Sequence, residues 1–285
     1  SYQSRHLELF LETFVIINGM LIVVPVSNTD DNLIEDFIKI FNLFGPYERH
    51  ELLVVCRPSD TAYGEKIYNG IATPKNNFRK QEFHAFWGDG PAGWPVGPNF
   101  YWKWTADLLH KRDNKLPWLW MELDMTPLRI GWADTLENGY RQCKKPFMGN
   151  FGDTTVVTGE GKLVKLCKHL VGAAVYPPIV KDYSLIWEHV PEINTAWDVL
   201  CQWEFVPLSH ETKLIQFCFR TQNYKKEIDM TFPARQIVIG EDTNGFPGEW
   251  DFDRPIDFEN AVIMHGCNDG SLARLLYTER VLEVT

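Results

Sequence analysis

The chain has 285 residues and a formal net charge of −10, and 45% of its residues are hydrophobic and 14% aromatic. This apolar content suffices for one large core domain. The negative charge argues against a protein that coats nucleic acid non-specifically, although it leaves room for a local basic groove. The six cysteines show no C-x-x-C pair and no metal-ligand spacing, so we expect reduced thiols in a cytoplasmic protein and neither a zinc nor a redox site.

Residues 1–19 are expected to form an N-terminal extension. Apolar residues there follow helical spacing, but Glu8, Glu12 and Asn18 interrupt them, which argues against a membrane span or a signal peptide. Asn18-Gly19 also permits a hairpin. We favour a helical or irregular extension that leads into the first core strand.

The segment that follows has the pattern of a βαβ unit. Residues 20–26 form an apolar run that predicts a buried strand, and residues 51–56 form another. Between them lies a helix with apolar residues at core spacing, which Asp30 or Asp31 is expected to cap. Strand, helix and strand in this order predict a parallel, doubly wound α/β sheet. Phosphorylated ligands bind such sheets beyond the carboxyl ends of the strands.

The remaining elements are assigned more coarsely. Residues 86–98 are rich in Gly, Pro and Trp and predict a shaped loop. Helices are expected at 99–110, 133–142 and 194–205, and strands at 118–124, 168–176, 214–220, 236–239 and 261–264. Because we find no repeat and no low-complexity linker, we expect residues 20–150 and 151–285 to be two halves of one continuous domain.

The most informative segment is 118–124, an apolar run that ends in Glu122 and Asp124. Alternation along a strand would place both carboxylates on the same face. Two carboxylates at the end of a buried strand cost free energy unless a positive group meets them. A hard divalent cation, which also accepts phosphate oxygens, is a natural partner. The pattern therefore indicates metal-assisted chemistry on a phosphorylated substrate, and a turn cap or a surface ion pair is the structural alternative.

Four features in chain order resemble GT-A glycosyltransferases of the bacterial and phage kind. They are the opening strand at 21–26, Glu122-x-Asp124 with Pro127-Leu128-x-x-Gly131-Trp132 after it, the segment 172–177, and His265-Gly266. The resemblance covers most of the chain. It implies a Rossmann-like GT-A fold with a mostly parallel, twisted sheet flanked by helices. It also implies metal-dependent transfer of a sugar from a nucleotide sugar, with a UDP-sugar favoured, to an acceptor hydroxyl.

The resemblance implies roles for individual residues as well. Asp124, Glu122 and His265 are the expected ligands of Mn²⁺ or Mg²⁺, which would hold the diphosphate of the donor. The first acid is Glu where the motif of the family has Asp. The expected nucleotide pocket comprises Pro25, Val26, Ser27, Asn28 and Arg57. Donor binding is accordingly assigned to residues 20–150 and acceptor binding to residues 151–285.

Transfer with inversion requires a carboxylate base for the acceptor hydroxyl. Asp198 is our candidate, with Glu204 in reserve. Structural roles are also open to some of these residues, because Arg57 is placed to pair with Asp60 and the residues after the first strand suit a helix cap.

The acceptor that we favour is double-stranded DNA with hydroxymethylated pyrimidines such as 5-hydroxymethylcytosine, because phage enzymes that this chain resembles act on it. Basic runs at 144–145, 162–169 and 225–226 would contact phosphates, and aromatic side chains would stack on an extruded base. Those aromatic residues are Trp87, Trp94, Trp102 and Trp104. Protein or glycan acceptors, a sugar nucleotidyltransferase and a non-catalytic carbohydrate-binding module are the alternatives. A nucleotidyltransferase usually carries a Gly- and Lys-rich loop after the first strand, which residues 27–30 lack.

Overall fold

The computed structural model describes residues 18–91, 93, 95–152, 155–157, 163–165, 168–184, 196–220, 260–267 and 270–284. Some predicted features lie outside these residues: 1–17 of the N-terminal extension, the strand at 236–239, Trp94 and lysines 225–226. The division into a donor half and an acceptor half stays a prediction.

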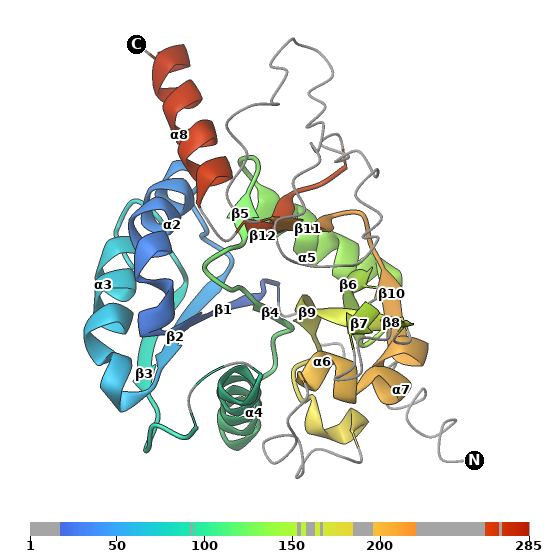
Figure 1. The fold of residues 1–285 in the computed structure, drawn as a ribbon. Coiled ribbons are helices and arrows are strands. Elements are labelled where there is room, and N and C mark those ends of the chain that lie inside the picture. Colours follow the sequence, from blue (N-terminus) through green and yellow to red (C-terminus); the bar gives the residue numbers. More distant parts are fainter. Residues whose placement is uncertain are drawn as a thin grey trace.

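A seven-stranded sheet forms the centre of the fold, in the order β10-β6-β9-β4-β1-β2-β3 (Figure 1). Its strands are β1 (Leu21–Val26), β2 (Glu51–Cys56), β3 (Lys80–Ala85), β4 (Trp118–Trp120), β6 (Phe147–Gly152), β9 (His169–Tyr176) and β10 (Ser209–Glu211). Neighbouring strands are parallel except where β9 pairs with β4 and β6, so every strand but β9 runs in one direction. The predicted α/β class with a mostly parallel sheet is confirmed.

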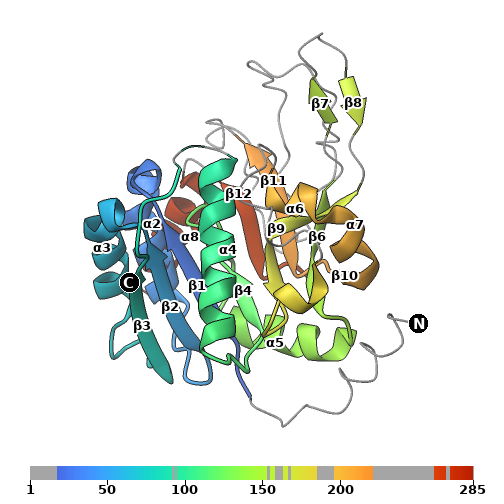
Figure 2. The ribbon, with the colours of Figure 1, turned by 90° about the horizontal axis from the view of Figure 1, so that it is seen from below.

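Helices cover both faces of this sheet, because its strands bury side chains on both. Ile22 and Val24 of β1 pack in the core under α2 (Asp31–Leu43), α3 (Thr61–Ile71) and α5 (Trp132–Cys143). Leu21 and Val23 pack in the opposite core with α4 (Val96–Lys111), α6 (Trp197–Leu200) and α7 (Gln202–Phe205). Figures 1 and 2 show these two layers. Strands that are covered on both faces require the nearly continuous apolar runs seen in the sequence.

The predicted βαβ unit is present, but its helix begins differently. A short 3-10 turn, η1 (Asn28–Asp30), precedes α2, and Ser27 and Asp30 cap this turn reciprocally. The Ser27 hydroxyl accepts the Thr29 N–H at 3.3 Å, and the Asp30 carboxylate accepts the Ser27 N–H at 3.3 Å. Asp30 is the N-cap residue of α2, as predicted, but its carboxylate makes no cap hydrogen bond to that helix, because it is turned back onto Ser27.

The predicted strand at 118–124 is shorter than expected. β4 ends at Trp120, and after Met121 the chain leaves the sheet in a turn in which the Met125 N–H donates to the Glu122 carbonyl at 3.0 Å. Glu122 and Asp124 thus lie in a turn and not on one face of a strand, which corrects the argument from strand alternation. The turn leads into β5 (Thr126–Pro127), which pairs with a different sheet.

That second sheet has the order β11-β12-β5 and joins segments far apart in the chain. β12 (Ile263–Cys267) pairs in parallel with β11 (Ile215–Arg220) and antiparallel with β5, with Met264 opposite Thr126. His265 follows Met264 and therefore lies beside the turn that carries Glu122 and Asp124. The C-terminal helix α8 (Ser271–Val284) packs on α2, where Arg274 pairs with Asp36.

Some elements of the second half differ from the prediction. The helix expected at 194–205 consists, within the described residues, of α6 and α7, which are separated at Cys201. Strands β7 (Thr155–Val157) and β8 (Leu163–Lys165) form a separate hairpin. Short 3-10 turns are η2 (Pro58–Asp60), η3 (Lys181–Tyr183) and η5 (Val206–Leu208). Within the described part of the chain, no helix combines the length and apolar character that crossing a membrane requires.

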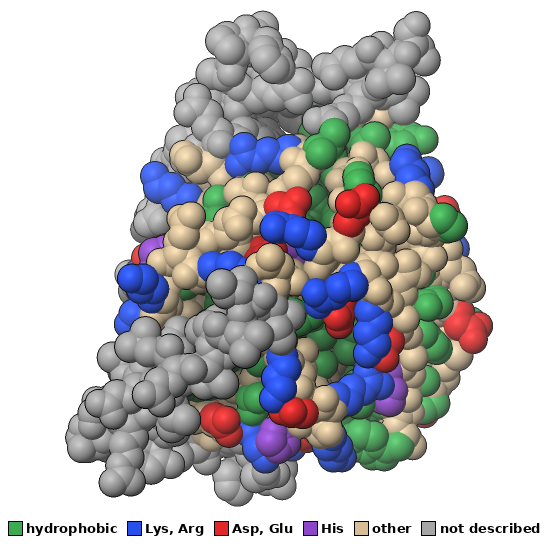
Figure 3. All heavy atoms as spheres, turned by 180° about the vertical axis from the view of Figure 1, so that it is seen from behind, with side chains coloured by type: hydrophobic (Ala, Val, Ile, Leu, Met, Phe, Trp, Pro, Cys, Tyr) green, Lys and Arg blue, Asp and Glu red, His purple; other side chains and the backbone are tan. Residues whose placement is uncertain are grey.

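Only some of the aromatic residues predicted to line a groove lie at the surface. Trp102 is fully buried and stacks on Trp197 with ring centroids 4.2 Å apart, so the expectation that it lines a groove is wrong. Trp87 is 68% exposed, with the Trp104 ring 4.9 Å away and the Lys111 ammonium 5.5 Å from its own ring. Figure 3 shows one face, on which Lys and Arg side chains are scattered and several lie beside Asp or Glu.

Candidate functional site

Three residues that the sequence singled out meet at one place. His265 Nε2 lies 3.0 Å from Glu122 Oε2 and 3.4 Å from Asp124 Oδ1. One possible ligand atom from each residue lies within 4.8 Å of the others. The His265 and Asp124 side chains are largely buried, while that of Glu122 is 35% exposed. The structure thus brings together the predicted metal ligands, although their role as ligands stays a prediction.

This group lies at the carboxyl end of the parallel sheet. In the order β3-β2-β1-β4, the chain adds β2 and then β3 on one side of β1, and it then crosses over to add β4 on the other side. The boundary between β1 and β4 is thus the topological switch point, the position at which open α/β sheets bind ligands. Glu122 lies two residues after the end of β4 at this edge, and the residues after β1 lie across the boundary from it.

The electrostatics of the group place a proton on the imidazole. Burial by itself would lower the pKa of His265, but the Asp124 and Glu122 carboxylates, with a smaller effect from Asp198, raise it to about 9. Burial pushes the pKa of Glu122 up, but the hydrogen bonds from His265 and Trp120 hold it below its usual range. Burial and the charge of Glu122 raise the pKa of Asp124 to about 6. At neutral pH, a Glu122 carboxylate therefore faces a His265 imidazolium.

The donor set fits a divalent cation. Two carboxylates and one imidazole supply the oxygen and nitrogen ligands that Mn²⁺ and similar ions accept. Asp124 Oδ1 is buried, and none of the described residues donates a hydrogen bond to it. The His265 imidazolium lies where a metal cation would bind. Metal binding through Nε2 therefore requires that this nitrogen lose its proton.

Further carboxylates surround the group. Asp30 is half-buried beside it, and burial, followed by the charges of Glu122, Asp124 and Asp60, raises its pKa to about 6. From the sequence we expected only a capping role for Asp30, because no local pattern shows that the chain brings Glu122 and Asp124 back beside it. So much negative charge at one edge of the sheet favours a bound cation.

Asp198, the predicted base, lies close enough to interact electrostatically with Glu122 and His265. Its carboxylate accepts the Gly172 N–H at 3.1 Å and the Val199 N–H at 2.9 Å. Burial raises its pKa, which is the direction that a general base requires.

The helix that carries Asp198 is anchored by its neighbour Trp197, which stacks on Trp102 and donates its backbone N–H to Asn99 Oδ1 at 2.8 Å. Glu204, the reserve candidate, accepts the Ser184 hydroxyl at 2.6 Å.

The predicted nucleotide pocket lies at the ends of β1 and β2. Pro25 and Val26 are the last residues of β1; Val26 is buried, Ser27 is half-buried and Asn28 is exposed. Ser27 caps η1, as the structural alternative held, and the Asn28 N–H donates to Asp60 Oδ1 at 3.3 Å. The Ser27 hydroxyl also lies 3.0 Å from Thr29 Oγ1 and 3.5 Å from Asn28 Oδ1, so its contacts are local, and the role of these residues in binding a nucleotide stays a prediction.

Arg57 is held rigidly at the end of β2. Its Nε and Nη2 both lie 2.8 Å from Asp60 Oδ2, and Asp60 is completely buried. The Tyr101 hydroxyl accepts the Arg57 N–H at 3.2 Å and lies 2.9 Å from both the Val26 carbonyl and Asp60 Oδ2. The predicted pairing of Arg57 with Asp60 is present, whereas Tyr101 was missed because no local pattern in its helix marks it.

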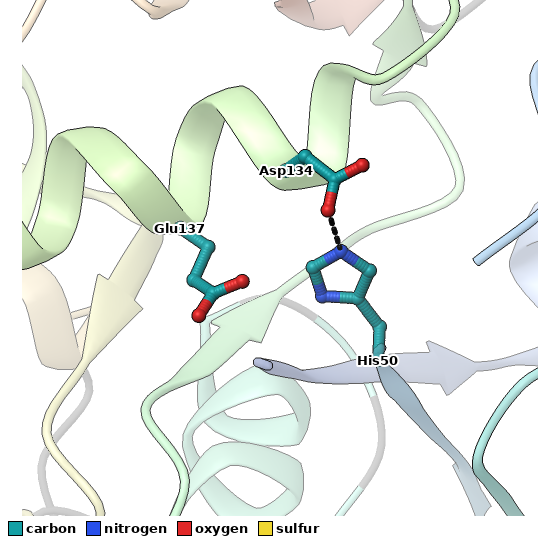
Figure 4. Close-up of side chains that lie close together, drawn as sticks. All are labelled: His50, Asp134 and Glu137. Carbon is teal, nitrogen blue, oxygen red and sulfur yellow. Dashed lines mark hydrogen bonds and ion pairs between the residues drawn. The ribbon is translucent and has the colours of Figure 1, made fainter. Parts of the chain in front are cut away.

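A second histidine with two carboxylates lies at the opposite edge of the sheet, where β1 and β2 begin (Figure 4). His50 Nε2 is 3.3 Å from Asp134 Oδ1, and Glu137 is on the same helix as Asp134. Arg49 donates to Asp134 at 2.9 Å and pairs with Glu137 at 3.2 Å, while Arg141 donates to Glu137 at 2.7 Å. Because these arginines balance both carboxylates, we assign no metal site here.

The contacts of His50 also define its tautomer. Its Nδ1 accepts the Met20 N–H at 3.3 Å, and burial holds its pKa below the usual range. The neutral ring therefore carries its proton on Nε2 and donates it to Asp134. His50 thus joins the start of β1 to α5.

Among known proteins, the similarities found are to solved structures. No protein-family model matches the chain, and no curated protein matches it. The apo form of the glycosyltransferase GlyE of Streptococcus pneumoniae TIGR4 is similar at a TM-score of 0.40 and 9% identity, covering 69% of this chain and 46% of that one. A second structure of GlyE gives a TM-score of 0.40 and 8% identity, with 68% and 45% covered. The chain thus spans about half the length of these solved chains.

We predict that His50→Asn flattens part of the pH dependence of stability. Asn keeps an acceptor for the Met20 N–H but does not titrate and does not reach Asp134. Since the folded pKa of His50 lies below the unfolded value near ~6.5, its contribution is present above that pH and is lost as the pH falls. The variant should lose about 1 kcal/mol at pH 7.5, and this deficit should shrink towards pH 5.

Urea unfolding at pH 7.5, 6 and 5 measures this difference, with His110→Asn at an exposed position as the control. A deficit of constant size across the series contradicts the assignment.

The paired His265 behaves in the opposite sense. Because its folded pKa is raised to about 9, its contribution to stability is complete below the unfolded value near ~6.5 and is lost as the pH rises through about 9. We expect NMR titration of the metal-free protein to find this imidazole still protonated at pH 7.5, and Glu122→Gln to lower its pKa. An imidazole that titrates near its ordinary value would show that the pair does not form.

Proposed function

We propose that the protein is a metal-dependent glycosyltransferase that moves a sugar from a nucleotide sugar to an acceptor hydroxyl. The observation that carries the proposal is the meeting of Glu122, Asp124 and His265 at the switch point of a parallel sheet. Carboxylates and an imidazole at that edge suit a cation that holds a diphosphate. The resemblance to GT-A glycosyltransferases supplies the reaction, and the geometry supports the cation site that this reaction would use.

In this proposal, Glu122, Asp124 and His265 hold Mn²⁺ or Mg²⁺. When bound, the cation supplies a Lewis acid that offsets the charge growing on the departing diphosphate. Arg57 offers guanidinium N–H groups at the end of β2; its charge is paired with buried Asp60, and Asp60 and Tyr101 keep it in place before substrate arrives. A charge that needs no reorganisation stabilises a transition state better than one that must first be oriented.

Asp198 is the proposed base. The acceptor oxygen forms a bond to the anomeric carbon while the bond from that carbon to the diphosphate breaks, and the diphosphate keeps the electron pair. The proton of the acceptor hydroxyl passes to the Asp198 carboxylate. The raised pKa of Asp198 supports this role, as does its electrostatic contact with Glu122 and His265.

For the substrates, we propose a UDP-sugar donor and double-stranded DNA with hydroxymethylated pyrimidines as acceptor, in the cytoplasm. Exposed Trp87, with the Lys111 ammonium over its ring, supports the acceptor, because stacking and phosphate contacts are both available there. Lys168, from one of the predicted basic runs, is paired with Glu211 and is therefore less suited to bind phosphate.

The test is transfer itself, measured as product mass after incubation with UDP-sugars and hydroxymethylated DNA, with and without Mn²⁺. We expect Mn²⁺-dependent product, and Asp124→Asn should reduce the rate about 100-fold or more while unfolding stays cooperative. Asp113→Asn, at an exposed carboxylate paired with Lys115, is the matched control.

Full turnover by Asp124→Asn would remove the metal centre from the mechanism.

Transfer to DNA should also fall steeply between low and moderate salt. Equal transfer to a free sugar without any salt effect would remove DNA as the acceptor and leave the transferase.

A separate test addresses the base. Asp198→Asn keeps the size of the side chain but only one of the two oxygens that accept the Gly172 and Val199 N–H groups, so we expect a less stable but still cooperative fold that binds Mn²⁺, while kcat falls about 100-fold or more. Glu204→Gln is the comparison, since Glu204 is the other acidic candidate on the same segment. If Glu204→Gln lost activity and Asp198→Asn retained it, the roles would be exchanged.

A further inference from the structure

The carboxylate of Glu122 is shared between two partners. Trp120, the last residue of β4, is 1% exposed, and its indole Nε1–H donates to Glu122 Oε1 at 3.0 Å. The other oxygen, Oε2, lies 3.0 Å from His265 Nε2. One oxygen is therefore engaged by an indole, and the other faces the position that a cation would occupy.

The indole is itself immobile. Trp120 pairs with Val23 in the sheet, and its ring lies in the core under α4, with the Trp118 ring 6.2 Å away at 77°. A ring of this size does not turn without opening the core around it. Glu122 lies in a turn, so the hydrogen bond gives a turn residue the rigidity of the neighbouring strand.

We propose that Trp120 is a positioning residue that presents Oε2 of Glu122, and not both oxygens, to the divalent cation. The inference rests on the proposed function, because it concerns the same metal. Hydrogen bonds to a ligating carboxylate fix its orientation, and losing such a bond typically weakens metal binding about 10-fold to 100-fold. Without the indole N–H, Glu122 is free to rotate, and orienting it costs entropy when the metal binds.

The chain offers a matched control in Trp118. It lies two residues earlier on the same strand, is fully buried and packs in the same core as Trp120. Its indole Nε1 has no hydrogen-bond partner among the described residues. Trp118→Phe therefore removes similar packing without removing a hydrogen bond to the site.

The experiment compares Mn²⁺ affinity, measured by EPR of free Mn²⁺, in the full chain and in three variants. These are Trp118→Phe, Trp120→Phe, and a protein with 3-benzothienylalanine at position 120, in which sulfur replaces the indole N–H and the ring shape is kept. Both changes at 120 should weaken Mn²⁺ binding about 10-fold or more, and Trp118→Phe less than about threefold. The Mn²⁺ concentration for half-maximal transfer should rise in parallel, while kcat at saturating Mn²⁺ is retained.

The outcomes separate the two proposals. Absence of Mn²⁺ binding by the unaltered protein overturns the metal-dependent function. If the unaltered protein binds Mn²⁺ and the benzothienyl protein binds it equally well, the metal centre stands and the positioning role of Trp120 is overturned. Equal weakening by Trp118→Phe also overturns it, because packing would then explain the effect. Should Trp120→Phe fail to fold, the benzothienyl protein, with its unchanged ring shape, decides.

Discussion

Negative charge at the carboxyl end of a buried sheet is the constraint on which the site depends. Glu122 and Asp124 lie in the turn after β4; Asp30 interacts electrostatically with both, and Asp198 interacts with Glu122. Such carboxylates lose hydration on folding, and they remain ionised only if positive charge lies close by. In the metal-free protein, the His265 imidazolium supplies that charge. A divalent cation would supply more positive charge. The ion pair of the metal-free protein is therefore compatible with a metal centre in the metal-bound protein.

The fold meets this constraint by joining two sheets. The main sheet delivers the carboxylates through β4, and the small sheet delivers the imidazole through β12. The two meet because β5, directly after the acidic turn, pairs with β12. Arg57 is brought to the same edge by β2, where the buried Asp60 and the Tyr101 hydroxyl hold it. The residues proposed as donor-side cation, metal ligands and base therefore come from four strands or helices that are distant in the sequence, each anchored in one of the two cores.

The sequence predicted what local patterns determine. Apolar runs identified β1 and β2, and the order of elements identified a parallel sheet. The convergence of Glu122, Asp124 and His265 came from the family resemblance, since nothing local relates residues 143 positions apart. Other predictions were wrong because they depend on contacts between residues that are far apart in the sequence. The strand at 118–124 ends early because β5 is recruited by β12, and Trp102 is buried because Trp197 stacks on it. Trp120 and Tyr101 act through side-chain hydrogen bonds that leave no periodic trace in the sequence.

The proposed metal centre requires that a cation and a diphosphate bind between the acidic turn and His265. A crystal structure of the protein grown with Mn²⁺ and UDP, with anomalous scattering recorded at the manganese edge, tests this requirement. We expect one anomalous peak in contact with Asp124, Glu122 Oε2 and His265 Nε2, and with the diphosphate on its open side. A peak elsewhere, with Glu122 and His265 still hydrogen-bonded to each other, would contradict it.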